Sequence, residues 1–72
     1  MNGISDYDLK KRFTYVAPKE GQPELYVSIR DMAHVLAQFI VNHSNPSREQ
    51  SLAVTKIEEA VMWANAGIAR NG

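Results

Sequence analysis

The stretch from Pro46 to Arg70 constrains this chain most, because it carries the start signal, the repeat and the stop signal of one long helix. Pro46 disfavours the helical conformation at the residue before it, and Ser47 and Gln50 have the spacing of a capping box. Arg70 adds positive charge in the last turn, and Asn71-Gly72 supplies the stop. The sequence therefore predicts a helix over Ser47 to Arg70.

This predicted helix has more apolar faces than one partner helix can cover. One face follows the spacing of a helix packed lengthwise on another, at Val54, Ile57, Val61, Ala64 and Ile68. A second stripe of small residues recurs every seven positions, at Ala53, Ala60 and Gly67. Met62 and Trp63 then occupy the side that should be solvated. We therefore expect this helix to be buried in an assembly.

A second long helix is predicted upstream, over Pro23 to His43. Pro23 suits the first position of a helix, and His43 precedes the turn residues Ser44-Asn45-Pro46. A connection this short makes the two helices antiparallel. Apolar residues step along the helix by four and three positions, at Leu25, Ile29, Met32, Leu36 and Phe39, with Ala33, Val35 and Ile40 beside them.

The first 22 residues carry weaker signals, and we expect them to form an arm. Residues 1–3 are predicted to be a loose tail, and Ser5 is predicted to cap one or two helical turns over residues 6–11. Phe13 to Val16 are aromatic and β-branched, so this segment should be extended and lie across the helices. The predicted fold class is all-α: an antiparallel two-helix hairpin over residues 23–72, with residues 1–22 as a short helix and extended arm.

Size and composition favour stabilisation of this hairpin by assembly into a helical homo-oligomer. A chain of 72 residues makes one small domain with a marginal core, and it has no cysteine for disulfides or thiolate metal sites. His34 and His43 have no partners at metal-ligand spacing, so neither a metal site nor a cofactor is expected. A net charge of zero disfavours duplex DNA binding, and no signal peptide or membrane span is apparent, so we expect a cytosolic, soluble protein.

Three cations and two aromatic residues gather in the arm, in the string Lys10-Lys11-Arg12-Phe13-Thr14-Tyr15. In an extended segment Phe13 and Tyr15 point to the same side, where both can stack on a base while the cations meet phosphates. The alternative is that both rings simply pin the arm to the hairpin. The pattern leaves both interpretations open.

A further candidate anion site is Arg48, where a guanidinium and the N–H groups of a helix start come together. The alternative is a solvated first turn with ordinary helix pairs such as Lys56 with Glu59. Trp63 and Asn65 are interpreted as a packing anchor and a register-setting polar group at an oligomer seam. The sequence has no nucleophile with an adjacent base and no glycine-rich phosphate loop, so an enzyme is not expected.

One string of residues is long enough to indicate a family. It reads S-R-E-Q-S-L-A-V-T-K-I-E-E-A-V-M-W-A-N-A-G-I-A-R and follows F-T-Y-V-A-P-K-x-x-Q-P-E-x-Y-x-x-I-R. Together these strings resemble the helical hairpin domain shared by phage anti-CBASS and Thoeris anti-defence proteins, over about residues 12–71. Proteins of this family act as sponges, which bind the cyclic oligonucleotide or cyclic ADP-ribose alarm signals of the host without cleaving them.

The resemblance implies a homohexamer in the cytoplasm of the infected host. It implies pockets for cyclic dinucleotides or glycocyclic ADP-ribose between paired protomers, and pockets for cyclic trinucleotides where three protomers meet. By position, the implied ligand-binding residues are Arg12, Phe13, Tyr15, Arg48, Thr55, Lys56 and Glu59. The implied oligomer-interface residues are Val61, Met62, Trp63 and Asn65.

Two other functions stay open on the sequence. A structural or regulatory helical oligomer could act as an adaptor that binds a partner helix through Met62 and Trp63. A nucleic-acid-binding helical domain could use Lys10, Lys11 and Arg12, although the neutral net charge disfavours it. Heating the protein with cyclic dinucleotides and trinucleotides separates these functions, because only a sponge gains stability with ligand concentration.

Overall fold

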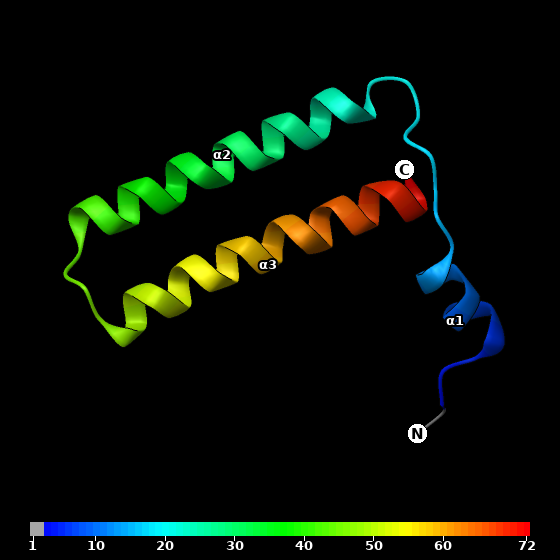
Figure 1. The fold of residues 1–72 in the computed structure, drawn as a ribbon, viewed down its shortest axis with the longest axis horizontal. Coiled ribbons are helices and arrows are strands. Elements are labelled where there is room, and N and C mark those ends of the chain that lie inside the picture. The colour runs from blue at the N-terminus through cyan, green and yellow to red at the C-terminus, as the bar shows by residue number, and fades with distance from the viewer. Residues whose placement is uncertain (1–2) are drawn as a thin grey trace.

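The computed structural model describes residues 3–72, and within them it has three helices and no strand. The helices are α1 (Asp6–Phe13), α2 (Gln22–His43) and α3 (Arg48–Asn71). α2 and α3 run antiparallel side by side, and α1 lies near the C-terminal end of α3 (Figure 1). The all-helical hairpin predicted from the sequence is confirmed. Of the predicted loose tail, Met1 and Asn2 lie outside the described residues.

The ends of α3 are formed largely by the predicted signals. The Ser47 hydroxyl accepts a hydrogen bond from the Gln50 backbone N–H at 3.0 Å, and the Gly72 N–H donates to the Ile68 carbonyl. A capping box also requires the Gln50 side chain to accept a hydrogen bond from the Ser47 N–H, and this bond is not formed. The side-chain amide nitrogen of Gln50 lies 3.3 Å from the Ser44 carbonyl and 3.4 Å from the Val41 carbonyl. Gln50 therefore closes the turn between the two long helices.

The contact between α2 and α3 follows the predicted stripe on α3 but only part of the one on α2. All five predicted α3 residues are half-buried: Val54, Ile57, Val61, Ala64 and Ile68. On α2 the half-buried residues are Tyr26, Ile29, Ala33, Ala37 and Ile40. Three of them belong to the predicted apolar stripe, whereas its members Leu25, Met32, Leu36 and Phe39 are exposed. The small side chains of Ala33 and Ala37 let the helices approach there, which turns the larger stripe to one flank.

The two flanks of the α2/α3 contact differ in chemistry. Met32 and Leu36 lie on one flank, where their side chains are 73% and 51% exposed. Arg30 and His34 lie on the other flank of α2, because successive residues advance by about 100° around a helix. There they line a hollow between the two helices together with Glu58 of α3.

The chain is a flat layer that buries none of its described apolar side chains. Its extents are 45 × 37 × 14 Å, so it is little thicker than the roughly 10–12 Å of one helix. Its accessible surface is 6102 Å², against about 4,500 Å² for a compact monomer of 8.1 kDa. The exposed side chains of the flank that carries Met32 and Leu36 contribute to this excess of accessible surface. None of the described helices is long and apolar enough to span a membrane.

The arm differs from the prediction in where its helix ends. The Ser5 hydroxyl accepts a hydrogen bond from the Asp8 N–H at 3.1 Å, as predicted, but α1 continues through Phe13. Lys10, Lys11 and Arg12 form helices readily and stand at the C-terminal end, where positive charge is favourable. Phe13 is therefore helical, and the extended segment begins only after it.

Candidate functional site

The candidate site lies between α1 and the C-terminal end of α3, where two surface hollows share Arg70. One hollow, of about 430 Å³, is lined by Tyr7, Lys10, Lys11, Thr14, Val16 and Arg70. The other, of about 480 Å³, is lined by Ile4, Leu9, Arg12, Phe13, Trp63 and Arg70. We call the first the lysine hollow and the second the aromatic hollow. Both volumes fall within the range of about 300 to 1,000 Å³ typical of small-molecule pockets.

Positive charge is concentrated at this site although the whole chain is neutral. Lys10, Lys11, Arg12 and Arg70 account for four of the eight Lys and Arg residues, and no carboxylate lines either hollow. Three of these cations, Lys10, Lys11 and Arg12, are consecutive residues in the last turn of α1. An unbalanced group of cations on a small surface attracts an anionic ligand.

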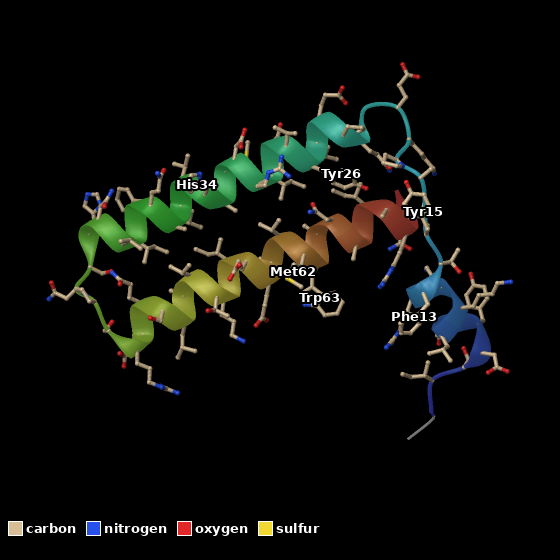
Figure 2. The ribbon with its side chains drawn as sticks, in the orientation of Figure 1. Phe13, Tyr15, Tyr26, His34, Met62 and Trp63 are labelled. Carbon is tan, nitrogen blue, oxygen red and sulfur yellow. The ribbon has the colours of Figure 1, made fainter. Side chains whose placement is uncertain are left out.

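Two aromatic rings accompany the cations in the aromatic hollow. Phe13 at the end of α1 is 84% exposed, and Trp63 of α3 is 70% exposed. Trp63 extends from the side of α3 that faces away from α2 (Figure 2). Exposed rings beside guanidinium groups can stack on flat heterocycles while the cations bind phosphate oxygens. The arrangement therefore suits a ligand that combines negative charge with aromatic rings.

One side-chain hydrogen bond ties α1 directly to α3. The Lys11 ammonium donates to the Asn71 side-chain carbonyl at 3.2 Å, and both residues are exposed. Because Asn71 is the last residue of α3, this bond places α1 at the end of the hairpin. It also holds Lys11 at the edge of the site rather than free in solvent.

Most of the other predicted ligand-binding residues lie away from this site within one chain. Tyr15 is close to it: it stands between Thr14 and Val16 of the lysine hollow, is 82% exposed and does not itself line either hollow (Figure 2). Arg48 begins α3 at the opposite end of the hairpin. Thr55 is exposed near the middle of α3, where Lys56 and Glu59 form an ion pair at 3.6 Å. Of the predicted set, therefore, only Arg12 and Phe13 line the hollows of a single chain.

The predicted interface residues divide between three places. Trp63 lines the aromatic hollow, whereas Val61 and Met62 line the hollow of about 520 Å³ between α2 and α3. Asn65 is half-buried, and its side-chain oxygen is shielded from solvent yet accepts no hydrogen bond from the described residues. Buried oxygens of this kind are usually paired with a protein group or an ordered water.

Sequence reasoning missed Arg70 as a site residue. The sequence placed Arg70 among the charged residues of the second long helix and not with the arm, since it lies almost sixty positions from Arg12. Only the antiparallel hairpin and the return of the arm bring it beside α1, so no local pattern could have revealed this. Within residues 3–72, no group of three or more metal-ligating side chains gathers.

Comparison with known proteins gives one result. A family model described as Acb2/Tad1, hairpin domain, matches residues 6–69, which include α1, the connecting segment, α2 and most of α3. No curated protein and no solved structure matches the chain.

Proposed function

This chain belongs to the Acb2/Tad1 hairpin-domain family, and from that premise we propose that it is a phage immune-evasion protein that sequesters cyclic nucleotide signals. The ligands are cyclic dinucleotides, cyclic trinucleotides or cyclic ADP-ribose isomers made in bacterial anti-phage defence. The protein acts in the cytoplasm of the infected host and does not cleave them. The observation that carries this proposal is the group of four cations and three exposed aromatic rings, Tyr7, Phe13 and Trp63, at the end of the hairpin.

The chemistry of these ligands fits the site. Each phosphodiester carries one negative charge, and taking it out of water is tolerable only where cations or N–H groups meet it. Arg12 and Arg70 offer forked donors on the two sides of the aromatic hollow. Phe13 and Trp63 offer ring faces to the bases. We therefore assign Arg12 and Phe13 to ligand binding, with Arg70 as an added contact.

Four of the remaining predicted residues require more than one protomer. Arg48, Thr55, Lys56 and Glu59 lie away from the two hollows in a single chain, so they can serve the site only if a neighbour supplies them. Tyr15 lies between Thr14 and Val16 of the lysine hollow and is close to the site within one chain. We propose a homohexamer in which residues 23–72 form the assembling hairpin and residues 1–22 the arm. The proposed interface residues are Val61, Met62, Trp63 and Asn65. The excess accessible surface and the Asn65 oxygen support an assembly.

A binding experiment with charge-removing variants tests this function. We expect cyclic di-AMP or cyclic tri-AMP to raise the melting temperature of the wild type in proportion to the logarithm of ligand concentration. Arg12→Ala or Arg48→Ala should weaken binding by about 1.5 to 3 kcal/mol in calorimetry, the scale of a hydrogen bond to a charged group. Lys19→Ala is the matched control, because it removes an exposed cation that lines neither hollow.

The outcomes separate the site from the function. If both arginine variants bind as the wild type does, the site is misplaced even though a sponge remains possible. If the wild type gains no stability from any cyclic nucleotide, a structural or adaptor oligomer becomes the better reading. Recovery of linear products after denaturing the complex would contradict sequestration without cleavage.

A further inference from the structure

Gln22 is the only buried residue among residues 3–72, with 7% of its surface exposed. It begins α2 and uses both ends of its side-chain amide. The side-chain oxygen accepts a hydrogen bond from the Lys19 backbone N–H at 2.9 Å. The side-chain nitrogen donates to the Ile68 carbonyl of α3 at 3.3 Å. A polar side chain buried in a chain without a buried apolar core is held there by its hydrogen bonds.

These two bonds join three parts of the molecule. Lys19 ends the segment that comes from α1, Gln22 begins α2, and Ile68 lies in the last turn of α3. The backbone between them turns sharply, because Gly21 has a φ of 83° and the Gln22 N–H donates to the Lys19 carbonyl at 3.0 Å. Gln22 therefore fixes where the arm leaves the hairpin, beside the end of α3.

We infer that Gln22 is a positioning residue, whose side-chain amide holds the arm against the C-terminal end of α3 and so sets the geometry of the lysine and aromatic hollows. Both hollows have one wall from α1 and share Arg70 of α3, so their shape depends on how the arm is placed. The Lys11–Asn71 bond is the second tie, but it joins two exposed side chains. The effect on ligand rests on the proposed function, whereas the placement of the arm does not.

The chemistry of the amide makes the inference specific. Gln22→Glu keeps the size of the side chain and can still accept from Lys19, but its carboxylate cannot donate to Ile68. It also sets a negative charge against a carbonyl at the negative end of the α3 dipole. Gln22→Met removes both hydrogen bonds while keeping a long, helix-forming side chain. If Gln22 only filled space, methionine would be tolerated and the arm would stay in place.

The first measurement needs no ligand. A helix of eight residues is marginal alone, so backbone amides in α1 are protected from hydrogen exchange only while the arm is docked. We expect Gln22→Glu and Gln22→Met to speed exchange in α1 roughly tenfold, as for the loss of about 1.4 kcal/mol of docking energy, with the α2/α3 contact unchanged beyond the Gln22–Ile68 bond. Gln38→Glu is the matched control, because Gln38 is exposed on the same helix and the charge change is identical. Unchanged exchange in α1 of both Gln22 variants would overturn the inference.

The second measurement uses cyclic di-AMP and cyclic tri-AMP as probes in calorimetry. We expect the Gln22 variants to bind the better probe roughly tenfold more weakly than the wild type and Gln38→Glu, the factor that corresponds to the same docking energy. Faster exchange in α1 with unchanged affinity would overturn the link between the arm and the hollows. If the wild type binds neither probe, the proposed function fails, and the exchange data alone decide whether Gln22 places the arm.

Discussion

Two glutamines hold the two ends of the hairpin, and neither role follows from local sequence. Gln22 joins the arm, α2 and α3 at the open end, while Gln50 bonds the last turn of α2 and Ser44 at the closed end. The capping box predicted that the Gln50 side chain accepts a hydrogen bond from the Ser47 N–H. Only the other half of that motif is present, in which the Gln50 backbone N–H donates to the Ser47 hydroxyl. A long amide reaches whichever carbonyl the tertiary fold places nearby.

The role of Gln50 can be measured as stability. We expect Gln50→Ala to lower the free energy of unfolding by about 1 kcal/mol, because carbonyls in the turn lose their side-chain donor. Thermal and urea unfolding at one protein concentration measure this change. Gln38→Ala serves as the control, since the exposed Gln38 side chain makes none of these bonds. Equal stability of the Gln50 and Gln38 variants would show that water replaces the Gln50 amide without cost.

At the scale of elements, the starts and ends of the long helices could be predicted to within one residue. Their signals are local: Ser47 accepts the Gln50 N–H, Pro23 stands in the first turn of α2, and Gly72 ends α3. The length of α1 and the buried face of α2 could not be predicted. Both depend on which other part of the chain lies opposite the helix. The apolar repeat that includes Leu25 and Met32 is as regular as the repeat of residues that pack against α3.

The same distinction applies to the candidate site. Arg12 and Phe13 could be proposed because they are adjacent to other cations in one short string. Arg70 and Gln22 could not, because Arg70 meets the arm and Gln22 meets Ile68 only through contacts between residues far apart in the sequence. Contacts that join one element to another are therefore the ones that a single sequence does not predict.

The cap of α3 supplies a prediction for one element. Ser47→Ala should destabilise the chain by about 1 kcal/mol, because the Gln50 N–H loses its acceptor at the start of the helix. Loss of helical circular dichroism on heating is the measurement. Ser51→Ala is the control, since Ser51 is exposed one turn later and its hydrogen bond to the Ser47 carbonyl comes from the backbone N–H. If the Ser47→Ala and Ser51→Ala variants have the same melting temperature, the cap contributes nothing to the stability of this helix.

At the scale of the whole molecule, the flat layer leaves its largest apolar stripe in solvent. Leu36 and Met32 are the central residues of that stripe, and none of residues 3–72 covers them. Monomeric proteins rarely expose a contiguous apolar surface of this kind. This exposure is the reason to expect an assembly.

We expect Leu36→Glu to break the assembly. The wild type should scatter light as a particle larger than a dimer at micromolar concentration, because several apolar surfaces remain to be buried. A carboxylate at position 36 must be desolvated in any packed interface, so the variant should sediment as a smaller species. Gln38→Glu places the same charge on the far side of α2 and should leave the particle unchanged. A wild-type mass of 8.1 kDa would contradict this expectation.

The difference between the two flanks of the α2/α3 contact also limits how copies can stack. If both flanks of this flat molecule bound other copies in a heterologous way, each added copy would leave one binding surface unoccupied at either end. The assembly would then grow into fibres. Here Met32 and Leu36 lie on one flank, whereas Arg30, Glu58 and Met62 line the hollow on the other. Pairing of the Met32/Leu36 flank with the same flank of another copy is an isologous contact, so growth through that flank ends at a pair of copies. A larger particle needs a second contact, for which the proposed interface residues Val61 and Met62 beside the hollow are available.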